Sequence, residues 1–271
     1  MINGKEELEA ILKKYEIEYQ DVCYILSTIF SVKGIRENRD IEFILKPQKR
    51  EKLLKNYIES GGNGYNPYSE VIIFNENLQC HFNPYRIFDI DDEKLFEDTY
   101  SEKLEDGARV VKLELYAALK ILYNKIKDKK DIDLIKDKGF WTESFQKEVN
   151  KYLEIAKEKG FSIFEGNRQE KWKEIFAREN LYIFGTGGIG KTLFKKIERE
   201  GLSDKINGFL VSKKSAEFLY SKRIYDFSEI DKSNSNILLA VSFFNIVETK
   251  KLLQDMGFVN IEETYMFLEK Y

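Results

Sequence analysis

The chain has 271 residues, enough for one large domain or for two smaller ones that each bury a core of their own. Hydrophobic residues make up 42% of it, charged residues 34%, and the formal net charge at pH 7 is -3. This balance excludes a global basic field of the kind that draws proteins to nucleic acid. No run of about 18 apolar residues occurs, so we expect no membrane segment and a cytoplasmic protein. Cys23 and Cys80 each lie in an apolar run without a CxxC partner, which predicts buried thiols in a reducing compartment.

Residues 1–140 mix short apolar runs with amphipathic stretches, a texture that predicts an α+β domain. The expected elements are, in chain order, a helix over 5–16, a strand over 22–26, a helix from Ser27 to about Gly34, a strand over 40–45, a helix over 48–59, two paired strands over 71–74 and 78–82, and a helix over 113–127. Residues 141–180 are helical in pattern and strongly charged, and we interpret them as a helical linker.

Residues 181–271 alternate short apolar runs with helical stretches. We expect strands over 181–184, 206–211, 236–241 and near Ile261, with helices over 191–200 and 246–256. This alternation predicts a parallel sheet with helical crossovers, that is, a Rossmann-like module. The fold class predicted for the whole chain is therefore α/β, with the α+β domain first and the Rossmann-like module last.

A glycine-rich turn separates the first strand of this module from its first helix. Gly185, Gly187 and Gly190 satisfy the pattern G-x-G-x-x-G, in which a tight turn and a helix N-terminus hold a pyrophosphate. From Gly185 to Thr192 the same segment also satisfies G-x-x-x-x-G-K-T, the P-loop pattern, in which the lysine, here Lys191, binds phosphates. The nucleotide-binding residues predicted here are Gly185, Gly187, Gly188, Gly190 and Lys191.

Three other interpretations of this turn stay open. A P-loop NTPase would need an acidic metal ligand after the strand over 236–241, where Ser242 stands. NAD would need a carboxylate at the end of the second strand, where Ser212 is followed by Lys213 and Lys214. Those lysines suit either a 2′-phosphate or a solvated turn. The third interpretation is a βαβ module whose glycines serve packing alone.

Three segments of the module carry a resemblance: 208–212 (GFLVS), 224–229 (IYDFSE) and 239–242 (LAVS). In these segments the module is similar to the small Rossmann-like units appended to bacterial surface-polysaccharide and sugar-modifying enzymes. The resemblance covers about a third of the chain. It implies that the turn from Gly185 to Gly190 binds a nucleotide or nucleotide sugar, so the expected partner is a small-molecule nucleotide or sugar substrate.

Two carboxylates stand at the start of the second expected strand. Asp40 and Glu42 are two residues apart, so their side chains share one face, an arrangement that suits Mg²⁺ bound with a diphosphate or triphosphate. Ser27 and Thr28 begin a helix, where a phosphate is favoured. Arg39, like the nearby arginine at position 36, is placed to offset phosphate charge. The sequence therefore predicts a magnesium site at the two carboxylates, with phosphates held at the helix start.

The order of these motifs is similar to that of the nucleotidyltransferase superfamily. A helix start at Ser27-Thr28 is followed by the turn Gly34-Ile35-Arg36 and by D-x-E over 40–42, and the segments 113–120 (LELYAALK) and 127–135 (KDKKDIDLI) resemble the terminal helix of that superfamily. The region also resembles the LicD-type phosphotransferases of surface-glycan decoration, whose Trp-Asp-Asp motif it lacks. The resemblance implies a Mg²⁺-dependent nucleotidyl or phosphosugar transferase of bacterial cell-surface glycan metabolism, with Arg39 on the developing charge.

The third carboxylate that this resemblance implies should lie on a later central strand. The strand over 78–82 offers Gln79 and His81 instead, so the catalytic base is left unassigned, and His81, Asp89 and Asp91 are the candidates for it. The alternative for His81 is a satisfied interior side chain, and the alternative for the acidic pair is a solvent-exposed strand edge. Two rival functions follow: a non-catalytic nucleotide-sugar-binding or scaffolding protein with a degenerate fold, and an NAD(P)-dependent sugar oxidoreductase.

Overall fold

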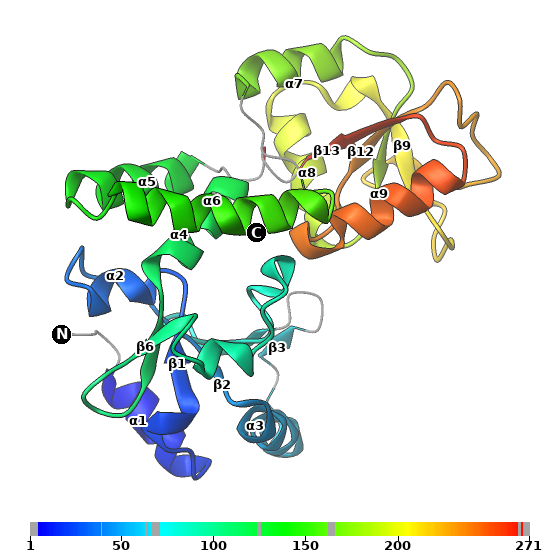
Figure 1. The fold of residues 1–271 in the computed structure, drawn as a ribbon. Helices are drawn as coiled ribbons and strands as arrows, with labels where there is room; N and C mark the ends of the chain where they lie inside the picture. Colours follow the sequence, from blue (N-terminus) through cyan, green and yellow to red (C-terminus); the bar gives the residue numbers. More distant parts are fainter. Residues whose placement is uncertain are drawn as a thin grey trace. The chain divides into compact units, whose positions relative to one another are not determined.

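Two sheets organise the chain, one in each of two units (Figure 1). The computed structural model describes residues 5–38, 40–62, 64–66, 71–123, 126–161, 166–264 and 267. The first unit comprises residues 1–122 and 128–159, and the second comprises residues 123–127 and 160–271. Helices alternate with strands in both units, so the predicted α/β class is confirmed. Within the described ranges no helix is long and apolar enough to cross a membrane.

The first unit is built on a mixed sheet with the strand order β3-β4-β5-β2-β1-β7-β6. Its strands are β1 (Val22–Tyr24), β2 (Ile41–Leu45), β3 (Tyr65–Asn66), β4 (Val71–Asn75), β5 (Leu78–His81), β6 (Ser101–Lys103) and β7 (Arg109–Val111). β2 runs antiparallel to β1 and parallel to β5, so it lies in the middle of the sheet. The strand pair expected over 71–74 and 78–82 is confirmed as the antiparallel pair of β4 and β5.

Six helices of the described chain flank this sheet. They are α1 (Lys5–Lys14), α2 (Thr28–Val32), α3 (Pro47–Glu59), α4 (Leu113–Tyr123), α5 (Ile126–Asp137) and α6 (Glu143–Glu158). α4 is apolar on nearly every side, and accordingly most of its residues are buried. The helix expected over 113–127 corresponds to α4, which ends at Tyr123, and to the start of α5 at Ile126; residues 124 and 125 lie outside the described residues.

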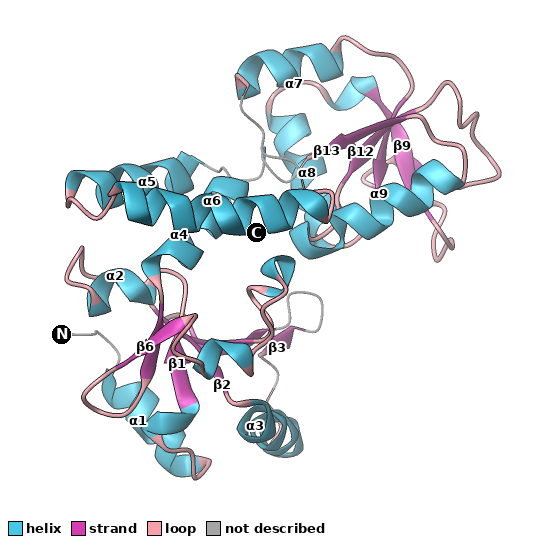
Figure 2. Cartoon of the chain, viewed as in Figure 1, coloured by secondary structure: helices cyan, strands magenta, loops and turns pink. Residues whose placement is uncertain are grey.

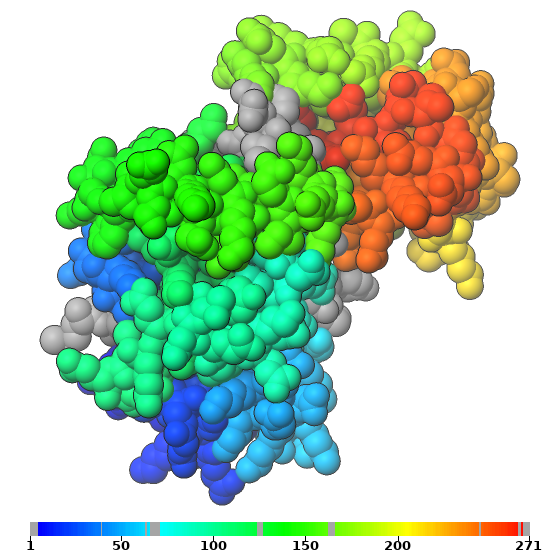
Figure 3. All heavy atoms as spheres, viewed as in Figure 1, coloured from blue at the N-terminus to red at the C-terminus, as the bar shows by residue number. Residues whose placement is uncertain are grey.

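α6 packs within the first unit. Its start is capped by Thr142, whose side chain accepts a hydrogen bond from the backbone N–H of Phe145. Phe145, Val149 and Tyr152 recur at helical spacing and are all buried. Tyr152 contacts Phe88 with ring centroids 5.6 Å apart, and Figure 3 shows the atoms of α6 as a band across the visible face of this unit.

The second unit is built on a sheet with the order β10-β11-β9-β8-β12-β13; Figure 2 shows its strands in magenta, with β9, β12 and β13 labelled. Its strands are β8 (Leu181–Phe184), β9 (Ile206–Val211), β10 (Phe218–Leu219), β11 (Lys222–Asp226), β12 (Asn236–Leu239) and β13 (Asn260–Glu263). All neighbours are parallel except β10, which runs antiparallel to β11 at the edge. Taken in chain order, the parallel strands lie 3-2-1-4-5, which is the Rossmann order. The predicted parallel sheet is therefore confirmed.

Three helices of the described chain cover this sheet: α7 (Arg168–Phe176), α8 (Gly188–Arg199) and α9 (Ile246–Asp255). α7 contributes Ile175 and Phe176 to the core of the second unit, and Trp172 packs against that core. The region 141–180, interpreted from the sequence as a linker, thus contains one helix of each unit, α6 in the first and α7 in the second.

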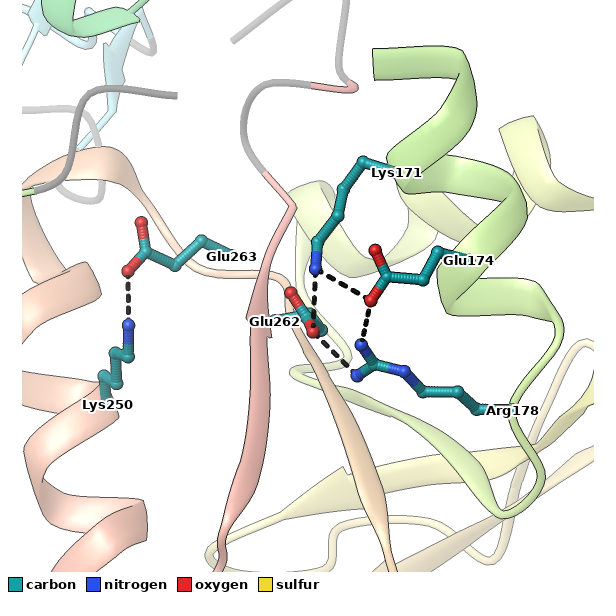
Figure 4. A network of polar contacts seen from close by, with 6 residues as sticks. All are labelled: Lys171, Glu174, Arg178, Lys250, Glu262 and Glu263. Carbon is teal, nitrogen blue, oxygen red and sulfur yellow. Dashed lines mark hydrogen bonds and ion pairs between the residues drawn. The ribbon is translucent and has the colours of Figure 1, made fainter. Parts of the chain in front are cut away.

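The edge strand β13 is tied to helices on both of its faces (Figure 4). On one face Glu262 pairs with Arg178, just after α7, at 2.7 Å and with Lys171 of α7 at 3.3 Å. On the other face Glu263, whose side chain is 8% exposed, pairs with Lys250 of α9 at 2.8 Å. Because neighbouring strand residues point to opposite faces, consecutive glutamates hold α7 and α9 to the same strand.

Candidate functional site

The strand register of the first sheet brings Glu42 and His81 together. Glu42 of β2 lies opposite Gln79 of β5 in the parallel pair, and His81 is on the same face, two residues further along. Nε2 of His81 lies 3.8 Å from Oε1 of Glu42, with only 15% and 17% of the two side chains exposed. Two of the residues predicted as a site thus share one half-buried spot.

The second oxygen of Glu42 is already bonded. Oε2 accepts hydrogen bonds from the backbone N–H of Ser27, at 2.9 Å, and from its hydroxyl. These are donors at the start of α2 that the sequence assigned to a phosphate, and here a carboxylate from the same chain takes them. Ser27 therefore orients Glu42, leaving Oε1 turned toward the imidazole.

Thr28 is fully buried, and its hydroxyl serves the backbone of β2. Oγ1 accepts from the N–H of Glu42 at 2.7 Å and donates to the carbonyl of Asp40 at 3.4 Å. Asn38, which the sequence analysis did not single out, donates to Ser27 Oγ at 2.9 Å and to the Asp40 carbonyl at 2.7 Å. An asparagine two residues before an expected strand is a weak signal, since its partners are known only once the strand is placed.

Asp40 directly precedes β2, and Glu42 is the second residue of that strand. Arg39, predicted to stabilise developing charge, lies outside the described residues. No group of three or more His, Cys, Asp or Glu side chains in the described ranges is arranged to hold a metal ion. Mg²⁺ commonly takes only one or two protein carboxylates and completes its shell with phosphates and water. The pair of Asp40 and Glu42 Oε1 fits that requirement by donor type.

Burial sets the protonation of His81. Desolvation lowers the pKa of the imidazole, and the nearby carboxylate of Glu42 opposes this with a smaller effect. Nε2 is buried and has no hydrogen-bond partner among the described residues. The imidazole is therefore neutral near pH 7, the form that accepts a proton or ligates a metal. Asp89, a substitute base by sequence, instead pairs with Lys159.

Two of the four glycines in the turn of the second unit are required by packing. Gly185 has a φ of +110°, and a Cβ on it would stand 2.9 Å from the carbonyl oxygen of Ala240. A Cβ on Gly190 would stand 2.0 Å from the carbonyl oxygen of Gly185. Gly185 also donates its N–H to the Leu210 carbonyl at 3.0 Å. These contacts hold the turn between the ends of β9 and β12, and they pack the start of α8 against the turn.

The other two glycines have no such requirement. A Cβ on Gly187 or Gly188 would meet nothing within 4 Å, and neither residue has a positive φ. Both are exposed at the start of α8, where Gly187 is the N-cap and offers no side-chain cap. The side chain of Lys191, three residues further along α8, is exposed as well. The open space at the first turn of α8 leaves its N–H groups accessible to an approaching group.

The turn lies where the strand order of the second sheet reverses. β9 pairs with one side of β8 and β12 with the other, so the loops after β8 and β12 flank the crevice in which open parallel sheets bind ligands. Ser242 follows β12 at this point. Its hydroxyl oxygen is buried without a hydrogen-bond partner among the described residues. In the sequence Ser242 marked only the absence of an acidic residue. The sheet order places its loop next to the loop of the glycine turn, because β8 and β12 are parallel neighbours.

The end of β9 carries a charge pair that the sequence did not reveal. Lys214 pairs with Glu229, which comes from beyond β11, at 2.6 Å. Lys214, the backbone N–H of Asp226 and Arg223 together lower the pKa of Glu229 to about 2. Lys214, one of the two lysines considered for a 2′-phosphate, is thus already paired, and a carboxylate does lie near this strand end, supplied by the loop after β11.

Two groups of residues are therefore candidate sites, one in each unit. In the first unit β2, β5 and the start of α2 assemble Glu42, His81 and Ser27. In the second unit β8, β12 and α8 assemble the glycine turn and Ser242. Compared with protein-family models, with curated proteins and with solved structures, the chain shows no significant match.

Proposed function

We propose that the second unit binds a nucleotide or nucleotide sugar through its phosphates, at the turn from Gly185 to Gly190. The observation that supports this most is the open space at Gly187 and Gly188 on the first turn of α8, at the reversal point of a 3-2-1-4-5 sheet. Packing accounts for Gly185 and Gly190 but not for these two glycines. A phosphate that approaches the backbone closely accounts for them.

The charges around the turn suit an anion. The first N–H groups of α8 and the positive end of its dipole lie at the glycine turn, and the exposed Lys191 adds a positive charge there. The hydroxyl of Ser242, which has no hydrogen-bond partner among the described residues, would gain one from such a ligand. Because a serine replaces the metal-binding acid of an NTPase, binding without triphosphate hydrolysis is the expected behaviour.

The test is a calorimetric titration of the full chain with UDP-glucose, CTP, UTP, NAD⁺ and NADP⁺. Gly188→Glu places a carboxylate in the open space without a clash, and that carboxylate repels phosphate while it favours the helix start. We expect it to weaken binding of the preferred ligand about tenfold or more. The matched control is Gln254→Glu on the exposed side of α9, which adds the same charge elsewhere in this unit. Equal weakening by both variants, or no binding of any ligand by the parent chain, would contradict the proposal.

A second candidate function belongs to the first unit: Mg²⁺-dependent nucleotidyl or phosphosugar transfer, in cell-surface glycan metabolism. The supporting observation is the neutral imidazole of His81 beside Glu42 on the neighbouring strand. Asp40 and Glu42 would hold the metal, which when bound would neutralise phosphate charge. Ser27 would keep the Glu42 carboxylate oriented through Oε2.

In this candidate reaction His81 is the base. Its Nε2 would take the proton of an acceptor hydroxyl as the hydroxyl oxygen forms its bond to phosphorus, and the bond from phosphorus to the leaving phosphate oxygen would break. Burial keeps the imidazole unprotonated before the step, and Glu42 stabilises the imidazolium that forms. Gln79, opposite Glu42, lies where the third carboxylate was expected and carries no charge.

Thermal-shift measurements with CTP and UTP, with and without Mg²⁺, test this candidate. We expect Mg²⁺-dependent stabilisation that is lost in Asp40→Asn and in Glu42→Gln and kept in Glu102→Gln, which alters an exposed carboxylate of the same unit. A chain that responds to NAD(P) alone would instead be an oxidoreductase. A chain that responds to none of these ligands would be a scaffold.

A further inference from the structure

A buried network of charged and polar side chains joins α4 to α5 in the first unit. Lys120 of α4 pairs with Asp128 of α5 at 2.7 Å and with Asp131 at 3.5 Å. The hydroxyl of Tyr116 donates to Asp131 Oδ2 at 2.8 Å. The side chains of Asp128 and Asp131 are 0% and 6% exposed. Two buried carboxylates thus share one buried lysine.

The remaining charge is balanced by Arg36, which lies at the surface. Nη1 of Arg36 pairs with Asp131 Oδ1 at 2.8 Å, and 40% of the arginine side chain is exposed. Its guanidinium also lies over the ring of Phe30, 4.7 Å from the centroid. Phe30 in turn packs edge-on against Tyr116 with centroids 5.2 Å apart. The guanidinium is therefore fixed from two sides.

Several contacts place Arg36 beside the Glu42 site. The loop that carries it is bonded to α2, because the backbone N–H of Arg36 donates to the Phe30 carbonyl and Asn38 donates to Ser27 Oγ. Burial and then Asp131 raise the pKa of Tyr116 most, and among the smaller effects Glu42 raises it further while Arg36 lowers it, so both charges act on the same hydroxyl. The further N–H donors of Arg36 have no partner in the described part of the chain.

The ion pairs alone do not explain why this network is buried. A buried ion pair contributes little more to stability than well-packed apolar side chains would, because desolvation offsets its attraction. What the network does provide is a guanidinium with a fixed direction and unused donors. A guanidinium fork of this kind matches the oxygens of a phosphate.

We infer that Arg36 binds a phosphate of the nucleotide at the Glu42 site, and that Asp131, held by Tyr116 and Lys120, is its positioning residue. This inference rests on the transfer proposed for the first unit. Arg36 would supply two parallel N–H donors to the phosphate while Nη1 stays on Asp131. The buried carboxylates then act through Arg36 and never touch the ligand.

The test uses the full chain carrying Gly188→Glu, with inorganic pyrophosphate and Mg²⁺ as the probe. Arg36→Lys keeps a charge that can pair with Asp131 but loses the outward fork. We expect the melting temperature to be unchanged and the affinity for pyrophosphate to fall about tenfold. Arg109→Lys, which alters the ion pair with Asp98 in the same unit, is the control and should leave the affinity unchanged.

The positioning role is tested by a double-mutant cycle. Asp131→Asn should weaken binding as Arg36→Lys does, and the double variant should be no weaker than either single one, because both remove the same interaction. If Asp131→Asn folds poorly, Tyr116→Phe replaces it: it keeps the ring, removes the hydroxyl from Asp131, and should cause a smaller loss of affinity. Unchanged affinity in Arg36→Lys overturns the inference, and additive losses overturn the role of Asp131.

The variant Glu42→Gln distinguishes a failure of this inference from a failure of the transfer function proposed for the first unit. Loss of pyrophosphate binding in both Glu42→Gln and Arg36→Lys supports the two together. Loss in Arg36→Lys alone supports an anion site at Arg36 and overturns the metal site. Loss in Glu42→Gln alone supports the metal site and overturns the inference. A parent chain that binds no pyrophosphate overturns both.

Discussion

Glu42 connects two residues at the residue scale, because each of its two oxygens has a different neighbour. Oε2 is held by the N–H and hydroxyl of Ser27, while Oε1 faces His81 at 3.8 Å, beyond hydrogen-bond distance. A cation that binds Oε1 can therefore leave the bonds to Ser27 in place. The carboxylate is presented in one orientation before any ligand arrives, and this lowers the cost of binding one.

The lowered pKa of His81 predicts a pH dependence of stability. In the unfolded chain the imidazole titrates near pH 6.5, and in the folded chain it titrates below that value because it is buried. Just below pH 6.5 the unfolded state then binds more protons, so the free energy of unfolding falls as the pH drops toward the folded pKa. We expect the parent chain to lose more stability between about pH 7.5 and about pH 5.5 than His81→Asn does.

Urea unfolding measures this difference. The chain has two tryptophans; Trp141 lies in the first unit and Trp172 in the second. In a Trp172→Phe background the fluorescence of Trp141 therefore follows the unit that contains His81. Parallel loss of stability in the parent and in His81→Asn would show that the imidazole is not protected from protonation by folding.

At the scale of an element, two glycines of α8 differ in whether the structure has room for a side chain. Gly190→Ala sets a Cβ 2.0 Å from a backbone oxygen, and a backbone contact of that kind can be relieved only if α8 moves. Gly188→Ala meets nothing and removes conformational freedom from the unfolded chain. We expect Gly190→Ala to destabilise the second unit by several kcal/mol, on the order of an overpacked core, and Gly188→Ala to be neutral or slightly stabilising.

Trp172 fluorescence during urea unfolding, in a Trp141→Phe background, measures both effects. The two variants add the same methyl group to one helix, so each serves as the control for the other. Similar midpoints for both would mean that α8 adjusts its position freely, and the assignment of Gly190 to packing would then be wrong.

The periodicity of the sequence predicted the elements whose own residues are apolar. It did not predict elements that form only because a neighbouring strand pairs with them. The strands near Cys23, Phe43 and Phe209 were predictable because each is a short run of buried side chains. β11 was not predicted, since within it only Ile224 is buried and its other residues are partly exposed. The strand forms because β9 offers it a parallel partner, and a partner distant in sequence leaves no local trace.

The candidate site was predictable in its members but not in its bonds. The D-x-E spacing around Glu42 and the helix start at Ser27 were visible in the sequence. The sequence did not show that the Glu42 carboxylate accepts the hydrogen bonds of Ser27. This follows only from the packing of α2 against β2. Likewise the sequence showed a mixed run of Lys and Asp before residue 135, and only the pairing with α4 shows that Asp128 and Asp131 are buried.

At the scale of the whole molecule, the chain passes between the two units more than once. Residues 123–127 belong to the second unit, 128–159 return to the first, and 160–271 complete the second. In the second unit Tyr123 packs against Phe243 with ring centroids 4.7 Å apart. The boundary between the units is thus not a single linker that can be cut without loss.

Fragments of the second unit test where it begins. Residues 160–271 retain α7, whose Ile175 and Phe176 are 1% and 5% exposed and so belong to the core. Residues 181–271 lose both side chains, each of which contributes about 1.5–3 kcal/mol when buried. We expect the longer fragment to melt cooperatively by circular dichroism and the shorter one to be unfolded or to melt without a transition. Cooperative melting of the shorter fragment would show that α7 is dispensable.

The ion pair between Arg36 and Asp131 also orders events during translation. Domains begin to fold from the N-terminal side as the chain leaves the ribosome, so β2 and β5 are available well before α5. Glu42 and His81 are therefore synthesised before Asp131, the residue that fixes the guanidinium of Arg36. The first unit is completed only when α6 has emerged, and by then residues 123–127, which belong to the second unit, have already been synthesised. The ribosome thus releases part of the second unit before it has finished the first.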